Sequence, residues 1–166
     1  MWHDKIEVKK GDVGERIVDD YFRNYGYIIY TPEEGSPHLI DRYYIKDKDN
    51  LFFAEVKTKP KRNNYPDTGF DYRHYEGYKI LQDLGHKVCV FFVDEVEASV
   101  YGNTLSEISK PSTLEYNGRI IEYPLREGEL IYFRRDTMKE VTILTQDEVM
   151  EIRGHESRNY PYEIYS

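Results

Sequence analysis

The residue types best suited to chemistry gather in one short segment of the sequence. Residues 51–59 read as a β-strand, in which alternate side chains project to opposite faces, so Glu55, Lys57 and Lys59 share one face. A carboxylate and an ammonium group two residues apart on a strand form a prearranged acid–base pair. Asp41 belongs to the preceding β-rich run, and a hairpin between the two runs can bring its carboxylate beside that of Glu55.

Two carboxylates that converge at one sheet edge repel each other unless a cation separates them. Ligands that are all oxygen suit Mg²⁺, which binds through one or two carboxylates and keeps several waters. We therefore expect Asp41 and Glu55 to bind Mg²⁺, for which Mn²⁺ can substitute.

The first element that must position these residues is an amphipathic helix over residues 11–26, whose apolar side chains recur every three or four positions. Asp12 followed by Glu15 forms a capping-box pattern at its start, and Gly26 supplies the left-handed residue that ends it. Residues 27–30 then predict a short first strand.

Two further β-rich runs, 39–45 and 51–59, are joined by the polar residues 46–50. This connection has the length of a hairpin, so the two runs should pair antiparallel. Residues 60–68 contain Pro and Asn and are expected to form a polar loop.

A second helix is predicted over residues 70–84, followed by the continuous apolar run 88–93. An uninterrupted apolar run is typical of a strand covered on both faces, as in parallel sheets. The order strand, helix, strand implies a crossover connection. Cys89 lies within the apolar run and is expected to be a core residue.

The chain beyond residue 96 has a weaker pattern and predicts a β-rich extension over 96–144, with a final helix that begins at Thr145. Thr145 and Glu148 form a capping box for that helix. The Tyr-rich tail after residue 154 is expected to serve packing or an oligomer contact. A length of 166 residues fits one domain, 1–166, with a core at 11–95.

Composition excludes several classes of protein. A single cysteine can form neither an internal disulfide nor a zinc ribbon. No window is apolar enough for a membrane helix, and the start is too polar for a signal peptide, so we expect a soluble, cytoplasmic protein. The net charge of −8 should repel a polyanion over most of the surface. Residues 41–80 are the exception, with 9 basic and 7 acidic side chains.

Glu15 in a first helix, Asp41 after a Pro-containing turn, and the run from Glu55 to Lys57 in a hydrophobic strand resemble the PD-(D/E)XK nuclease superfamily. The predicted order of elements over residues 11–95 is also similar to its core. The resemblance implies an α/β fold, with a restriction-endonuclease-like mixed β-sheet flanked by helices. It also implies Mg²⁺-dependent hydrolysis of phosphodiester bonds.

The resemblance also implies a role for each site residue. Asp41 and Glu55 would bind the metal, with the backbone carbonyl of Val56 as a further ligand. Lys57 would orient or activate the attacking water. Glu15 is either a member of this site or only the partner of Asp12 in the helix cap.

Within the superfamily, the compact layout is similar to Holliday-junction resolvases and to small phage or restriction-type nucleases. One departure is that Ile40 precedes Asp41, and the nearest proline is Pro37. The expected partner is DNA, with RNA not excluded, and a homodimer that presents two sites is a further expectation.

Several residues near this strand could contact phosphates, which positions a nucleic acid without reading its sequence. These are Lys59, Lys61, Arg62, His38 and Lys79. Bases could stack on three nearby aromatic residues, Tyr65, Tyr72 and Tyr75.

Plainer interpretations stand beside these. An acid and a base two residues apart on a strand also form ordinary surface salt bridges. A histidine such as His38 in a turn is often structural, and Lys79, with Gln82 one turn further on, can belong to a solvated helix face. The alternative function is a catalytically inactive nuclease-fold protein with a binding or assembly role, which the acidic composition favours.

Overall fold

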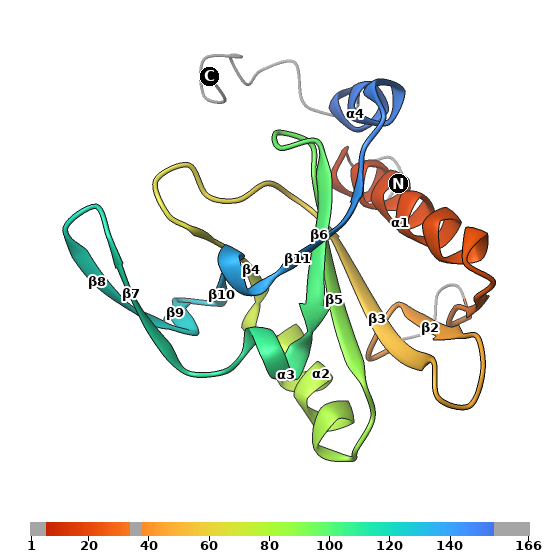
Figure 1. Ribbon diagram of the computed structural model, residues 1–166, viewed down its shortest axis with the longest axis horizontal. Helices are drawn as coiled ribbons and strands as arrows, with labels where there is room; N and C mark the ends of the chain where they lie inside the picture. Colours follow the sequence, from red (N-terminus) through yellow and green to blue (C-terminus); the bar gives the residue numbers. More distant parts are fainter. Residues whose placement is uncertain (1–5, 34–37, 155–166) are drawn as a thin grey trace.

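The protein is built on a six-stranded mixed sheet with helices on both faces (Figure 1). The computed structural model describes residues 6–33 and 38–154. In the sheet, the strands follow the order β1-β2-β3-β5-β6-β11. These strands are β1 (Ile28–Tyr30), β2 (Arg42–Ile45), β3 (Leu51–Thr58), β5 (Val88–Asp94), β6 (Ser99–Thr104) and β11 (Lys139–Ile143). The main helices are α1 (Ile6–Asn24), α2 (Tyr72–Asp83) and α4 (Gln146–Arg153).

The chain beyond β6 contributes a smaller β-rich part beside the main sheet. It contains the short helix α3 (Leu105–Ile108), β7 (Ser112–Tyr116), β8 (Arg119–Tyr123), β9 (Leu125–Glu127), β10 (Leu130–Arg134) and the 3₁₀ turn η2 (Arg135–Thr137). Strand β4 (Asp67–Asp71) joins it, giving a three-stranded sheet β4-β10-β9, and β7 pairs with β8 as a projecting hairpin (Figure 1).

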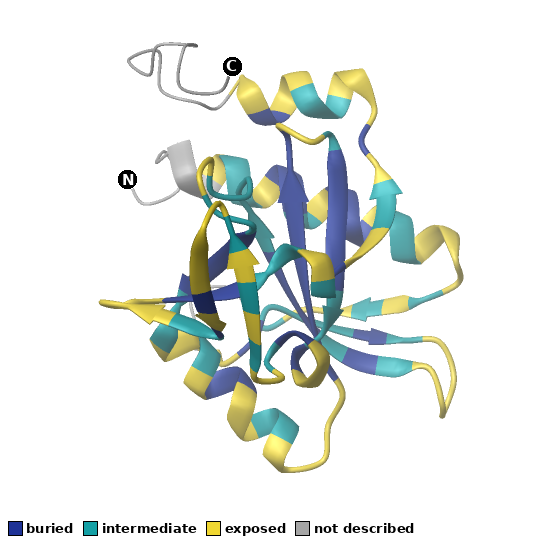
Figure 2. Cartoon of the chain, turned by 60° about the vertical axis from the view of Figure 1, so that its left-hand side comes forward, coloured by how far each residue is buried: buried dark blue, intermediate teal, exposed yellow. Residues whose placement is uncertain are grey.

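Pairing in the main sheet confirms the predicted hairpin and crossover. Strands β2 and β3 are antiparallel, and the polar residues 46–50 connect them. Strand β3 runs parallel to β5, and α2 lies between them in sequence. Every residue of β5 is buried, as its uninterrupted apolar run predicted (Figure 2). The capping box of Thr145 and Glu148 is present at the start of α4.

The helix predicted over 11–26 begins earlier than expected, because α1 starts at Ile6. Asp12 and Glu15 therefore lie inside the helix, and the predicted capping box is wrong. At the other end Gly26 has φ +86°, and its amide donates to the Arg23 carbonyl at 3.0 Å, as the left-handed ending requires.

The loop predicted over 60–68 is also shorter than expected. Strand β4 begins at Asp67, and the second helix starts only at Tyr72, with Asp71 as its N-cap. Phe70 is a buried strand residue packed with Phe133 at a ring distance of 5.4 Å. Local periodicity could not distinguish this strand, because it is stabilised by pairing with β10, whose residues are 59 to 67 positions further along the chain. The predicted features after residue 154 lie outside the described residues.

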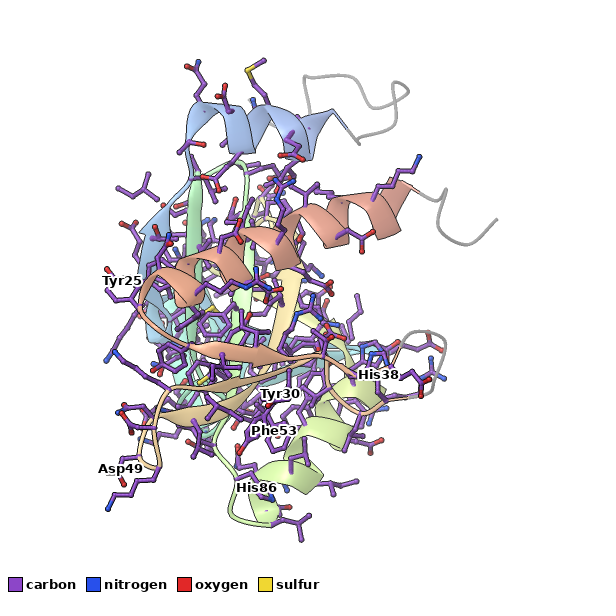
Figure 3. All side chains as sticks on the ribbon, turned by 90° about the vertical axis from the view of Figure 1, so that its right-hand side faces the viewer. Tyr25, Tyr30, His38, Asp49, Phe53 and His86 are labelled. Atoms are coloured by element: carbon purple, nitrogen blue, oxygen red, sulfur yellow. The ribbon has the colours of Figure 1, made fainter. Side chains whose placement is uncertain are left out.

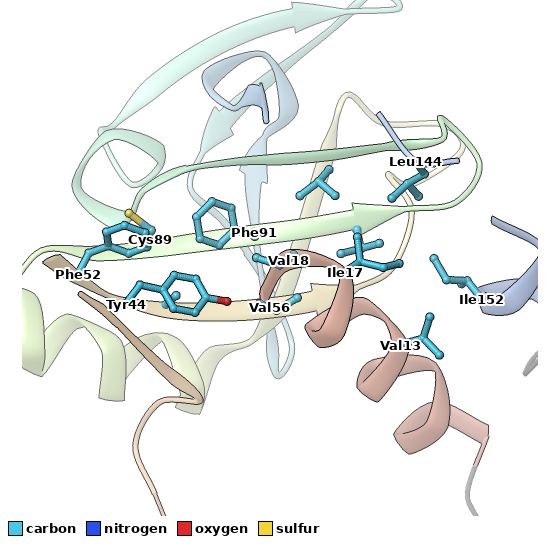
Figure 4. Close-up of a cluster of buried hydrophobic side chains, with 13 residues drawn as sticks. Val13, Ile17, Val18, Tyr44, Phe52, Val56, Cys89, Phe91, Leu144 and Ile152 are labelled. Carbon is cyan, nitrogen blue, oxygen red and sulfur yellow. The ribbon is translucent and has the colours of Figure 1, made fainter. Parts of the chain in front are cut away.

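Two hydrophobic cores sandwich the sheet. The first lies between the sheet and α1 with α4, where Val13, Ile17 and Val18 of α1 pack on Val56 and Phe91 (Figure 4). The second lies on the opposite face, under α2 and α3, and includes Tyr78, Val90, Phe92 and Phe133. Because side chains alternate along β3, its even-numbered residues Phe52, Ala54 and Val56 serve the first core. Glu55 and Lys57 consequently face α2.

Helix α1 approaches β3 most closely at Gly14, where a Cβ atom would collide with the hydroxyl of Thr58. We expect Gly14→Ala to lower the free energy of unfolding by about 1–3 kcal/mol, the usual cost of overpacking. Gly11→Ala in the same helix meets no atom within 4 Å, so helix propensity should raise its stability by up to about 1 kcal/mol. Urea unfolding of both variants tests this close approach, and equal stabilisation by the two would contradict it.

Candidate active site

The centre of the candidate site is formed by two carboxyl groups on adjacent strands. Arg42 of β2 pairs with Ala54 of β3, so continuing this register by one residue places Asp41 opposite Glu55. The two carboxyl groups share a hydrogen bond. The Glu55 side chain is only 5% exposed, whereas the Asp41 side chain is 21% exposed. The pair therefore has a buried member and a member that reaches the surface.

Lys57 lies beside this pair and is held from two sides. Its Nζ is 2.9 Å from Oε1 of Glu55 and 3.2 Å from Nδ1 of His74, which belongs to the first turns of α2. The ammonium group also lies 5.6 Å from the centre of the Phe70 ring. An ammonium group has three donors, so Lys57 keeps one donor for a further partner after these two hydrogen bonds.

Holding two carboxyl groups close together, one of them buried, is electrostatically unfavourable. Burial raises the pKa of Glu55 to about 8, Lys57 opposes this rise, and the neighbouring Asp41 adds to it. The hydroxyl of Tyr78, a buried residue of α2, hydrogen-bonds to Glu55, and burial together with this carboxylate raises the pKa of Tyr78. Near neutral pH Glu55 is thus protonated, and a cation bound between the two carboxyl groups would displace this proton.

His74 is predominantly neutral in this environment. Burial lowers the pKa of His74, and the nearby charge of Lys57 lowers it further. A neutral imidazole has one acceptor nitrogen, so Nδ1 can accept a hydrogen bond from the Lys57 ammonium group. His74 and Tyr78 are four residues apart on one face of α2, which is how this helix reaches both Lys57 and Glu55.

Arg42 fixes the start of β2 from the opposite face of the sheet. Its Nη2 donates to Glu15 at 2.8 Å, its Nε donates to Asp19 at 3.1 Å, and its Nη1 donates to the backbone carbonyl of Asp41 at 3.0 Å. Tyr44 donates to the same Asp19 carboxylate at 2.6 Å. Helix α1 therefore positions the backbone of Asp41 through Arg42.

In this arrangement Glu15 pairs with Arg42 and does not take part in a helix cap. Its carboxylate is paired with Arg42, and burial raises the pKa of Glu15 while Arg42 lowers it and Asp41 raises it. Glu15 is thus close enough to Asp41 for the charge of Asp41 to affect the pKa of Glu15, but the hydrogen-bond partner of Glu15 is Arg42.

The two carboxyl groups of Asp41 and Glu55 fit Mg²⁺ better than a metal ion that takes all of its ligands from the protein. Among residues 6–33 and 38–154, no three His, Cys, Asp or Glu side chains form a group that could hold a metal. Two carboxylates, one of them reaching the surface, match an ion that binds through one or two carboxylates and retains several waters. The hydrogen bond between Asp41 and Glu55 marks the place where their oxygens converge.

The basic cluster predicted to contact phosphates is turned largely toward the protein. Arg62 forms a bidentate pair with the fully buried Asp67, at 2.6 and 2.8 Å, and lies 3.9 and 3.6 Å from the rings of Tyr65 and Tyr132. Lys61 donates from Nζ to the backbone carbonyls of Arg62 and Tyr65, each at 3.4 Å. These contacts stabilise the connection into β4.

The remaining predicted contact residues differ in position. His38, labelled in Figure 3, lies 3.3 Å from Asp41, which is the more exposed member of the carboxyl pair. Burial lowers the pKa of Lys59, and Lys57 lowers it further. Lys79 is exposed on α2, and its nearest acid is Asp83 at 3.8 Å. The structure brings His38 to the carboxyl pair, whereas Lys79 sits on an exposed face.

The tyrosines predicted to stack on bases already have ring partners. The Tyr65 ring lies under Arg62, the Tyr72 ring lies 3.8 Å from the guanidinium of Arg126, and Tyr75 packs 5.8 Å from Phe133. The sequence could not show this, because Arg126 and Phe133 come from the β-rich extension.

His74 and Tyr78 were not singled out as site residues from the sequence. Tyr78 belongs to the apolar stripe of α2, and nothing local distinguishes it from a core tyrosine. The spacing of four residues between a histidine and a tyrosine, on the helix that follows the Glu55 strand, was the available signal.

No protein-family model and no curated protein sequence matches this chain. Among solved structures, the chain is similar to Hjc, a Holliday junction resolvase from the archaeal hyperthermophile Archaeoglobus fulgidus. The TM-score is 0.50 and the identity is 12%, over 80% of this chain and 92% of that chain.

This similarity confirms the predicted fold class. The chain has the restriction-endonuclease-like α/β fold, a mixed sheet flanked by helices, to which the resemblance with PD-(D/E)XK nucleases pointed. Within the described part of the chain, no helix has the length and apolar character needed to cross a membrane.

The raised pKa of Glu55 predicts a specific pH dependence of stability in metal-free protein. In the unfolded chain Glu55 loses its proton near its ordinary pKa of about 4.3, whereas in the folded protein it keeps the proton up to about 8. The free energy of unfolding therefore falls as pH rises through this window. Glu55→Gln removes the titration, so its stability relative to the original protein should increase with pH by up to about 1.4 kcal/mol per pH unit.

Urea unfolding in EDTA between pH 5 and 8 measures this difference. Asp47→Asn is the control, because hydrogen bonds from Asn50 lower the pKa of Asp47 and it does not titrate in this window. A difference between Glu55→Gln and the original protein that stays constant with pH would contradict the buried, protonated state.

Proposed function

We propose that this protein is a metal-dependent nuclease that hydrolyses phosphodiester bonds in DNA. The observation that carries the proposal is the convergence of the Asp41 and Glu55 carboxyl groups, with the Lys57 ammonium 2.9 Å from Glu55. The fold shared with Hjc, which is a Holliday junction resolvase, supports DNA as the substrate. A homodimer that presents two such sites belongs to the same proposal.

In this proposal Asp41 and Glu55 hold Mg²⁺ through their carboxylate oxygens, with the Val56 carbonyl as a further ligand. When bound, the ion polarises the scissile phosphate and lowers the pKa of a coordinated water. Glu55 must release its proton to act as a ligand. Tyr78 keeps the Glu55 carboxylate in place by donating a hydrogen bond to it.

Lys57 is the group proposed to orient or activate the attacking water. With Glu55 and His74 each accepting one hydrogen bond, the third donor of the ammonium group is available to a phosphate oxygen or to the attacking water. Placing a positive charge where the transition state gathers negative charge is the usual source of such stabilisation. His74 would act as a positioning residue, because it contacts Lys57 and not the substrate.

Substitution of Lys57 tests the catalytic role directly. We expect Lys57→Ala and Asp41→Asn each to lower the cleavage rate about 10²–10³-fold, the usual loss when one charge-stabilising group is removed. The assay uses labelled linear, flapped, four-way and single-stranded DNA, and single-stranded RNA, with Mg²⁺ and Mn²⁺. Lys110→Ala, an exposed lysine of the turn after α3 that pairs with Glu107 at 2.8 Å, is the matched control. Unchanged cleavage by Lys57→Ala would remove the proposed site.

A second candidate function is a catalytically inactive binding or assembly protein with the same fold. It is favoured by the net charge of −8 and by the inward orientation of Arg62, which leaves less positive charge for a polyanion. Metal binding separates the two candidates. Titration calorimetry should detect one Mg²⁺ or Mn²⁺ site at millimolar concentration in the original protein and none in Asp41→Asn. Absence of binding in the original protein would favour the inactive protein.

A further inference from the structure

A row of aromatic side chains crosses the sheet next to the carboxyl pair. Tyr30 of β1 pairs with Tyr43 of β2, and Tyr43 pairs with Phe53 of β3. Because paired residues project to the same face, the three side chains come from neighbouring strands and share the face that carries Glu55. The rings of Tyr43 and Phe53 are stacked, 4.6 Å apart at 25°. Tyr30 and Phe53 are labelled in Figure 3.

This row lines a pocket. A cavity of about 200 Å³ is bordered by Tyr30, Tyr43 and Phe53, together with Thr31, Pro32, Ile40 and Arg42. Tyr30 is 61% exposed, whereas Tyr43 and Phe53 are partly buried. The imidazole of His86 meets the edge of the Phe53 ring at 5.4 Å. The aromatic surface of the pocket is therefore partly accessible, because no helix among the described residues covers it fully.

The pocket adjoins the carboxyl pair along both strands. Tyr43 is two residues from Asp41, and Phe53 is two residues from Glu55, on the same face of the sheet. Two residues of a strand span about 6.6 Å. A nucleotide whose phosphate lies at the carboxyl pair would therefore have a base from the same strand within reach of the rings.

We propose that this pocket binds one unpaired nucleobase next to the scissile phosphate, so that the substrate is DNA with an unpaired or extruded nucleotide at the cleavage point. The inference rests on the proposed nuclease function and specifies its substrate. Base stacking on aromatic side chains tolerates any sequence, because every base has a π-face. It also supplies affinity that does not depend on the scarce positive charge of this surface.

The dimensions of the pocket favour a base over other occupants. Pockets for drug-sized ligands measure roughly 300–1,000 Å³, so a cavity of about 200 Å³ suits a single planar ring system. A second copy of the chain would need about 800 Å² of surface per partner for a stable interface, which is much more surface than the rim of one small pocket provides. Enzymes that carry out chemistry on a base extrude it from the duplex and stack it between aromatic or apolar side chains, so a pocket of this composition can hold a single base.

The test measures binding of oligonucleotides that carry 2-aminopurine, whose fluorescence falls when it stacks. One duplex carries the probe as an unpaired bulge and a second carries it in a base pair, and both are bound with Ca²⁺ in the Lys57→Ala background to prevent cleavage. The unpaired probe should be quenched on binding. Tyr30→Ala should abolish the quenching and weaken binding of the bulged duplex about tenfold, equivalent to about 1.4 kcal/mol, with no change for the paired duplex.

Two variants keep the result interpretable. Tyr30→Trp retains a stacking surface and should preserve both quenching and affinity. Tyr25→Ala removes a tyrosine of similar exposure, 59%, from the turn that follows α1, and should behave like the original protein. Circular dichroism confirms that the variants are folded.

The outcomes separate this inference from the proposed function. Equal loss of affinity for bulged and paired duplexes in Tyr30→Ala would overturn the base pocket, as would dissociation of a dimer by the same substitution in sedimentation. Quenching that persists although the original protein cleaves none of the substrates with Mg²⁺ would support the pocket and overturn only the nuclease.

Discussion

The site depends on placing one carboxyl group in a nearly dry position beside another. Removing a carboxylate from water is costly, and a like charge nearby increases the cost, so the folded protein keeps Glu55 protonated up to about pH 8. Lys57 and Tyr78 offset part of this cost by donating hydrogen bonds. A divalent cation would offset much more of it. Binding of a cation would therefore lower the free energy of the carboxyl pair. This is expected of a binding site, whereas in a purely structural site the pair would only lower the stability of the fold.

The pair is held in place from both faces of the sheet. On one face, Arg42 joins the backbone of Asp41 to two acids of α1, and α1 can approach because Gly14 has no side chain at Thr58. On the other face, α2 supplies His74 and Tyr78 to the polar groups of β3. Substrate-positioning groups are most precise when they lie on such rigid elements.

The β-rich extension explains why the basic segment after β3 is less available than its composition suggests. Asp67 is fully buried and accepts hydrogen bonds from Arg62 and from Tyr123, the latter at 2.6 Å. These contacts join the segment after β3 to the extension. Phosphate contacts near the site would accordingly be few, and the aromatic row of Tyr30, Tyr43 and Phe53 offers an attraction that does not need charge.

The sequence alone determined the two faces of β3 and most of the elements around it, although it missed β4. The alternation around Glu55 and Lys57, the hairpin before it and the apolar run of β5 are local patterns, and local periodicity suffices to predict them. Only the tertiary structure decided what each polar group meets. Arg62 turns inward because Asp67 and Tyr132 are brought to it by β4 and β10, and Glu15 meets Arg42 because α1 crosses the sheet there. Tyr132 is far from Arg62 in the chain, as Arg42 is from Glu15, and Asp67, although only five residues from Arg62, is held opposite it by the pairing of β4 with β10. No local pattern encodes contacts between segments that meet only when the chain folds.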